Sequence, residues 1–159
     1  MNGIAGRPSS DGSSGSDNIR RLNFAVVMIK QWEIQSDPAK LREVRTDLEN
    51  FTRSIGMKDE ASNAVGLVLN EALANIIRHG YDGATDKPIR VTAEQVEKEL
   101  KIVIRDWAKP FDPALIKPRY EDELKPGGLG LICIRKLMDG FKYERLPDGM
   151  LLTLTKKLV

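Results

Sequence analysis

The sequence has very few of the residues from which metal centres and disulfide frameworks are built. Its 159 residues include one cysteine, Cys133, and one histidine, His79. These counts exclude an internal disulfide, a cysteine-rich zinc site and any site built on several histidines. No apolar run approaches the roughly 18 residues of a membrane-spanning helix, and the N-terminus lacks the layout of a signal peptide. We therefore expect a soluble, cytoplasmic protein with no membrane partner.

Charge and composition limit the partners and the domain count. The chain has 25 basic and 23 acidic residues, a net charge of +2. Nucleic-acid binding needs a concentrated basic face, so we expect no direct contact with nucleic acid. Nine of the first 18 residues are Ser or Gly, which predicts a disordered tail over residues 1–18. The length then predicts one domain over residues 19–159.

Apolar residues at helical spacing predict two helices in the first half of the chain. The first begins at Ser36-Asp37-Pro38, with a capping side chain and a proline, and ends at Ile55-Gly56. The second begins with Asp59 as N-cap and ends near His79-Gly80, where Gly80 supplies a left-handed stop. Residues 19–35 are apolar and β-branched in part, which favours one or two strands, with an early helix as the alternative.

The second half of the chain changes to a period of two, which is typical of strands. Four segments are predicted as strands of two hairpins: residues 89–94, 100–106, 141–146 and 150–154. Between the hairpins lie an aperiodic loop, 112–126, and a third helix that opens at Gly127-Gly128-Leu129-Gly130. Blocks of helices and antiparallel strands predict an α+β fold of two layers, with the helices on one face of a mostly antiparallel sheet.

Three polar residues of the second helix lie four residues apart at the border of its apolar stripe. They are Glu71, Asn75 and His79. One interpretation is an ordinary solvated shoulder. The other is a carboxylate and an amide directed at one ligand, such as a hydrated Mg²⁺ ion with phosphates, because Mg²⁺ keeps several waters and needs few protein oxygens.

Asp106 and the glycine-rich turn are each open to two interpretations. Asp106 has the parity of the apolar positions of its strand, so it is either a buried acceptor for an amino donor or a frayed residue turned outward. The glycines of residues 127–130 either cap a helix or admit a phosphate to its N-terminus. The turn is neither a Walker A loop nor a dinucleotide-binding G-x-G-x-x-G pattern, and protein-kinase signatures are absent.

Taken together and in order, these segments resemble the motifs of the GHKL ATPases, a group that includes gyrase, MutL and the catalytic domains of histidine kinases. Residues 71–81 (EALANIIRHGY) resemble the N box. Residues 106–113 (DWAKPFDP) resemble the G1 box, and residues 128–139 resemble the G2 box and the helix after it. The resemblance is closest to bacterial anti-sigma-factor serine/threonine kinases of the partner-switching type. It implies the Bergerat ATP-binding fold.

The resemblance also implies roles for individual residues. Asn75 would hold Mg²⁺ against the phosphates of ATP, and Glu71 would be the catalytic carboxylate that activates the attacking hydroxyl or water. Asp106 would accept a hydrogen bond from the adenine amine. The remaining nucleotide-binding positions would be Ala108, Phe111, Gly128, Leu129 and Gly130, and residues 112–126 would form the ATP lid. His79 has no implied chemical role.

The implied function is an anti-sigma factor that sequesters a sigma factor and uses ATP and Mg²⁺ to phosphorylate a serine of an antagonist protein. A homodimer is also implied, with the N-terminal strands or the first helix as contacts. Ala108 departs from the motif, which usually has glycine there, and this favours the alternative of a binding module without phosphate transfer. A third hypothesis is a fragment of a histidine autokinase. Such proteins carry a phospho-accepting histidine upstream of the N box, whereas the single histidine here lies inside the N-box match.

Overall fold

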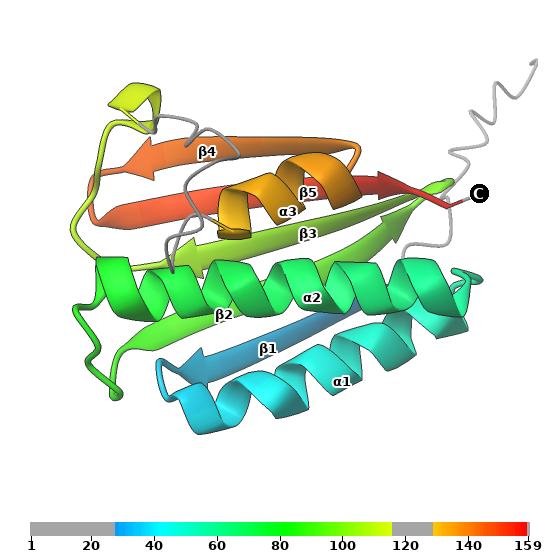
Figure 1. Ribbon diagram of the computed structural model, residues 1–159, viewed down its shortest axis with the longest axis horizontal. Helices are drawn as coiled ribbons and strands as arrows, with labels where there is room; N and C mark the ends of the chain where they lie inside the picture. The colour runs from blue at the N-terminus through cyan, green and yellow to red at the C-terminus, as the bar shows by residue number, and fades with distance from the viewer. Residues whose placement is uncertain (1–27, 116–128, 159) are drawn as a thin grey trace, which may run out of the picture.

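The computed structural model describes residues 28–115 and 129–158, which form a two-layer α+β domain (Figure 1). The antiparallel sheet has the strand order β1-β2-β3-β5-β4. Residues 1–27, which include the expected tail, and most of the expected lid lie outside the described residues. In chain order the elements are β1 (Ile29–Gln35), α1 (Pro38–Ser54), α2 (Asp59–Asn75), a π-helical turn (Ile76–Gly80), β2 (Pro88–Val96), β3 (Glu99–Asp106), a 3₁₀ turn (Pro113–Leu115), α3 (Leu129–Leu137), β4 (Gly140–Leu146) and β5 (Gly149–Lys157).

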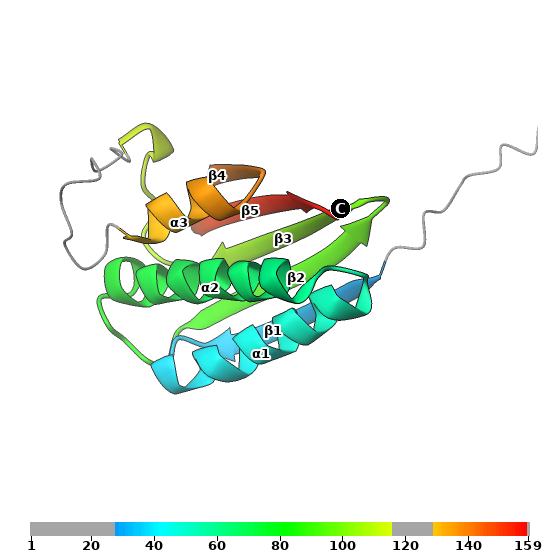
Figure 2. The same cartoon turned by 45° about the vertical axis from the view of Figure 1, so that its right-hand side comes forward.

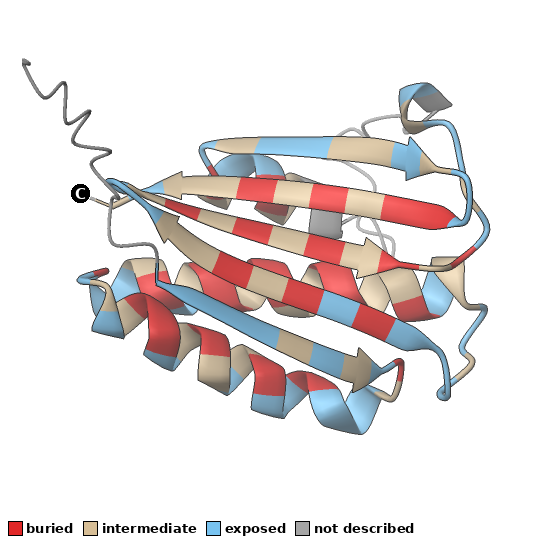
Figure 3. Ribbon diagram, turned by 180° about the vertical axis from the view of Figure 1, so that it is seen from behind, coloured by how far each residue is buried: buried red, intermediate tan, exposed pale blue. Residues whose placement is uncertain are grey.

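The expected fold class is confirmed, because the three helices lie on one face of the sheet (Figures 1 and 2). Figure 3 shows the opposite face, which no described helix covers. Along β3 the burial alternates strictly, and Leu100, Ile102 and Ile104 are fully buried toward the helices. The alternation of apolar and polar residues in the sequence therefore corresponds to one face of β3 that is buried under the helices and one face that is more accessible.

Helix α1 begins and ends as its sequence predicts. The Asp37 side chain accepts a hydrogen bond from the Ala39 amide at 2.9 Å, which is N-capping, and Gly56 has the positive φ of a helix stop. The expected N-cap of α2 is wrong by one residue. Lys58 occupies the N-cap position without a side-chain cap, and Asp59 is the first helical residue, bonded to Arg53 at 2.8 Å.

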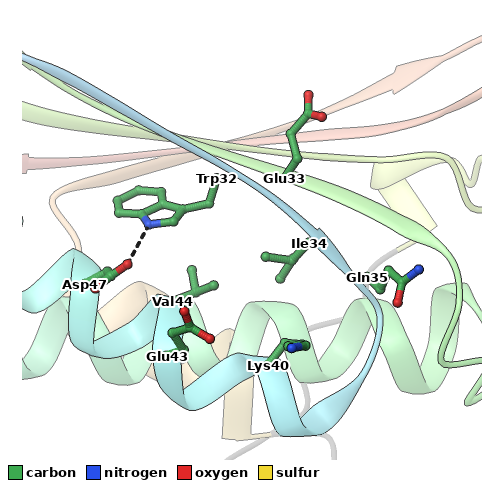
Figure 4. Close-up of a pocket in the computed structure, with 8 residues that line it drawn as sticks. All are labelled: Trp32, Glu33, Ile34, Gln35, Lys40, Glu43, Val44 and Asp47. Carbon is green, nitrogen blue, oxygen red and sulfur yellow. Dashed lines mark hydrogen bonds between the residues drawn. The ribbon is translucent and has the colours of Figure 1, made fainter.

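Residues 29–35 form a strand, so the alternative of an early helix is wrong for them. The strand β1 lies at the edge of the sheet and is held to α1 by the Trp32 indole N–H, which donates to Asp47 at 3.2 Å (Figure 4). Around this bond β1 and α1 border a groove, whose lining includes Ile34, Lys40 and Glu43. The groove lies at the β1 edge of the sheet, and none of the three motifs lines it.

The end of α2 differs most from expectation. The α-helical bonding stops at Asn75, and residues Ile76–Gly80 form one π-helical turn, closed by a bond of 2.9 Å from the Tyr81 amide to the Ile76 carbonyl. Gly80 does not have a positive φ; that conformation occurs after it, at Asp82 and Gly83. The left-handed stop at Gly80 is therefore wrong, and the role of this glycine lies in a close contact described below.

Among the described helices, none combines the length and the apolar character needed to cross a membrane.

Candidate functional site

The three motifs come together at one end of the molecule. The C-terminal half of α2, the C-terminal end of β3 and the N-terminus of α3 lie at the same end in both views (Figures 1 and 2). Helix α2 packs between α1 and α3, which positions its C-terminal half beside the start of α3. The three segments that begin at residues 71, 106 and 129 are far apart in the sequence. They are neighbours because the helices pack on a sheet whose strand order is not the chain order.

Asp106 is a buried carboxylate at the end of β3. Its backbone is paired on both sides, with Ile89 of β2 and Met150 of β5, and it is only 6% exposed. Its Oδ1 accepts a hydrogen bond from the Ala108 amide at 2.9 Å. The hypothesis of a frayed strand end is therefore wrong, and the parity argument is confirmed. A buried carboxylate is costly unless its oxygens are bonded, and here the Ala108 and Met150 amides supply hydrogen bonds.

Burial raises the pKa of Asp106, against the lowering effects of the amides of Ala108 and Met150 and of the Arg105 charge. The folded state then holds this proton more tightly than the unfolded state does. The free energy of unfolding should accordingly contain a component that falls as the pH rises from 3.8, the ordinary pKa, through the raised folded value.

We expect Asp106→Asn to remove this component, because an amide does not titrate. Urea unfolding of both proteins at a series of pH values measures this component. As the pH rises through that window, the unfolding free energy of the wild type should fall relative to that of the variant. Parallel profiles of the two proteins would contradict a buried titrating Asp106.

Ala108 lies against Gly80, and its backbone does not adopt the left-handed conformation that favours glycine. Residue 108 is 6% exposed, and its φ is not positive. A Cβ built on Gly80 would lie 3.0 Å from the Ala108 Cβ, which is tighter than nine in ten real contacts of a Cβ atom. The methyl group therefore occupies space that Gly80 leaves open, and no backbone strain requires glycine at 108.

Glu71 and Asn75 occupy successive turns of α2 and are both half-buried. Among the described residues neither side chain has a hydrogen-bond or ion-pair partner, so their oxygens are available to a ligand. His79 is exposed within the π-helical turn, where the changed bonding breaks the four-residue spacing assumed from the sequence. Of the three residues expected to line one side of the helix, only Glu71 and Asn75 keep that spacing.

The structure describes the other expected site residues only in part. Phe111 is 41% exposed, and its ring lies 6.0 Å from that of Tyr143. Leu129 and Gly130 are the first two residues of α3, while Gly128 lies outside the described residues. The N-terminus of a helix presents free N–H groups and a positive dipole end, which suit an anion.

Two tyrosines near Asp106 were not identified from the sequence. The Tyr81 hydroxyl accepts a hydrogen bond from the Trp107 amide at 2.8 Å. Burial, with a smaller contribution from the Asp106 charge, raises the pKa of Tyr143. The only sequence signal for Tyr81 was its place at the end of the N-box match, and Tyr143 had none, because only the pairing of β4 with β5 brings it here.

Comparison with known proteins assigns this arrangement to a family. A family model described as a histidine kinase-like ATPase domain matches residues 34–156. The chain belongs to the histidine kinase-like ATPase domain family, whose ATPase character implies nucleotide binding.

Relatives with serine-kinase names agree with that assignment. The chain is 32% identical over 118 residues to the serine/threonine-protein kinase BtrW of Bordetella bronchiseptica, a match that covers 69% of this chain and 83% of BtrW. It is 25% identical over 142 residues to the serine-protein kinase RsbW of Oceanobacillus iheyensis, which covers 84% and 87% of the two chains.

A solved structure supports the fold. The crystal structure of the RsbU and RsbW domains of Rv1364c from Mycobacterium tuberculosis matches with a TM-score of 0.61 and 19% identity. The match covers 82% of this chain and 32% of that longer chain, so this chain spans about a third of it.

Proposed function

We propose that this protein is an ATP- and Mg²⁺-dependent serine/threonine protein kinase that phosphorylates an anti-sigma-factor antagonist and sequesters a sigma factor. The observation that carries the proposal is the buried Asp106 at the end of β3. The next residue, Trp107, is hydrogen-bonded to Tyr81, which follows the π-helical turn at the end of α2. The serine-kinase names of the relatives supply the class of activity. The homodimer and the cytoplasmic location are part of the same proposal.

Asp106 would recognise the adenine base. The Asp106 carboxylate is bonded to the Ala108 amide and also interacts with the Met150 amide. A carboxylate has about four lone-pair sites, so it would still accept a hydrogen bond from the exocyclic amine. A buried acceptor of this kind discriminates strongly, because a ligand without the donor leaves it unpaired. The Ala108 methyl lies on Gly80, so its replacement of glycine does not weigh against base binding.

The phosphate end fits a Mg²⁺ ion that takes most of its ligands from the nucleotide and water. Within residues 28–115 and 129–158 no three His, Cys, Asp or Glu side chains are grouped to hold a metal. The Asn75 amide oxygen would be the protein ligand. Leu129 and Gly130, the first residues of α3, would bind the phosphates together with Gly128. Bound Mg²⁺ would supply charge neutralisation of the phosphates.

Glu71 would act as the general base. The serine hydroxyl oxygen of the antagonist attacks the γ-phosphorus, the bond from that phosphorus to the β–γ bridging oxygen breaks, and ADP leaves. Glu71 takes the serine proton as the new ester bond forms. Because phosphoryl transfer depends mainly on positioning and electrostatics, this small set of side chains suffices. The phosphate then changes the charge of the antagonist at its interface.

A calorimetric titration of Asn75→Ala tests the proposal at the metal. We expect the affinity for ATP to fall at least about tenfold in Mg²⁺ buffer, the loss of one charge-assisted contact, and to change little with EDTA present. Asn70→Ala is the matched control, since it removes an amide from another side of the same helix. Unchanged affinity of Asn75→Ala in Mg²⁺ would contradict the assignment.

Incubation with ³²P-labelled ATP and candidate antagonists separates the kinase from the binding module. Label on a partner serine identifies a kinase. ATP binding without label identifies a module that only sequesters its partner.

A further inference from the structure

The β2–β3 ladder ends with a side chain in place of a backbone pair. Regular pairing reaches Ile89 and Asp106, and the next positions in register are Pro88 and Trp107. There the Tyr81 hydroxyl lies between the two strands. It accepts from the Trp107 amide at 2.8 Å and donates to the Pro88 carbonyl at 2.6 Å. The hydroxyl thus forms one further, bridged rung immediately beyond Asp106.

The π-helical turn positions Tyr81 between the two strands. The Tyr81 amide closes the turn on the Ile76 carbonyl, and the preceding Gly80 lies against Ala108. Successive residues of one segment, 80 and 81, therefore contact successive residues of the other, 108 and 107. Burial raises the pKa of Tyr81, with opposing contributions from the Trp107 amide and Arg105. The hydroxyl keeps its proton and can donate and accept at once.

We propose that Tyr81 is a positioning residue for Asp106: its hydroxyl holds the end of β3 in the ladder, so that the carboxylate stays directed into the site. The inference rests on the proposed role of Asp106 in adenine binding. A strand end that loses its last rung frays, and fraying moves first the residue beside that rung. Since Tyr81 follows the helix that carries Asn75, the same contact joins the two ends of the nucleotide site.

Loss of the hydroxyl should leave the fold intact. The Trp107 indole is held separately on the uncovered face of the sheet, with the Arg105 guanidinium 4.5 Å and that of Arg90 5.5 Å from its ring centre. Arg105 is itself paired with Asp148 at 2.5 Å. Tyr81→Phe keeps the aromatic ring and removes only the bridge, so the change is confined to the backbone near Asp106.

The experiment compares the affinities of ATP and inosine triphosphate in the full chain. Inosine carries a carbonyl where adenine carries the amine, so the ratio of the two affinities measures recognition of that amine. We expect Tyr81→Phe to weaken ATP binding roughly five- to tenfold, the loss of about one hydrogen bond, and to leave inosine triphosphate binding unchanged. The preference for ATP should fall by that factor.

Trp32→Phe is the matched control. It also removes one hydrogen bond from an aromatic side chain, to Asp47, but at the far edge of the sheet, and should leave the preference for ATP unchanged. An unchanged preference in Tyr81→Phe, or an equal weakening of both nucleotides, overturns the positioning role. A wild-type protein that binds ATP no better than inosine triphosphate refutes the proposed role of Asp106 instead, so the two failures are distinguishable.

Discussion

Replacing Glu71 by glutamine should reduce phosphate transfer at least about a hundredfold while the affinity for ATP changes less than about threefold. A general base contributes roughly 10²–10⁴ to a rate, and glutamine keeps the shape of the side chain without its basicity. Glu71 lies one turn before Asn75, is half-buried and has no partner among the described residues. The substitution removes no salt bridge in the described part of the chain, so the affinity for ATP should be nearly unchanged.

Transfer of ³²P from ATP to a purified antagonist, followed with time, measures this effect, and calorimetry gives the affinity. Glu60→Gln is the control, because Glu60 is an exposed carboxylate in the first turn of the same helix. Full transfer by Glu71→Gln would remove the residue from the mechanism. A parallel loss of ATP affinity would assign Glu71 to binding and not to proton transfer.

Replacing Gly149 by alanine should cost about 2–4 kcal/mol of unfolding free energy, a large share of a typical domain's stability. About 1–3 kcal/mol comes from steric overlap and about 1 kcal/mol from the φ of +157°. A Cβ at this position would overlap the carbonyl oxygen of Asp106 and the guanidinium of Arg105. Backbone cannot yield as the end of a flexible side chain can, so β5 or the end of β3 must move. We expect ATP binding to weaken as well, since the displaced backbone is that of Asp106.

Urea unfolding measures the cost, and Gly83→Ala is its control. Gly83 has a φ of +79° with nothing within 4 Å of a built Cβ, so only the conformational penalty of about 1 kcal/mol applies. Equal costs at the two positions would show that the contact with Asp106 is not tight.

Much of the fold follows from patterns that are local in the sequence. The alternation over residues 100–106 predicted the burial of Asp106, and Asp37 and Gly56 marked the ends of α1. The errors arose where tertiary contacts override local preference. Gly80 was interpreted as a helix stop, since glycine usually signals one, but its lack of a side chain serves the approach of Ala108.

The candidate site, like the fold, was predicted only where its residues follow the regular geometry of one element. Asp106 could be found from parity, and Glu71 with Asn75 from helical spacing, because both signals come from the regular geometry of one element. Phe111 and Ala108 came from resemblance alone, whereas the glycines were already candidates because they precede a helix. Tyr81 and Tyr143 could not be found in this way, since their contacts with Trp107 and Phe111 join segments of different elements.

The order of polar and apolar residues thus indicated the class of fold, and the motifs indicated the family and the side chains that we propose for the chemistry. Which segments of the candidate site lie near one another was decided by tertiary packing. The π-helical turn, the Gly80–Ala108 contact and the Tyr81 bridge bring the end of α2 against the end of β3. The physical reason is that periodicity records which face of an element is buried, whereas the meeting of two elements depends on steric fit and hydrogen bonds between residues far apart in the sequence.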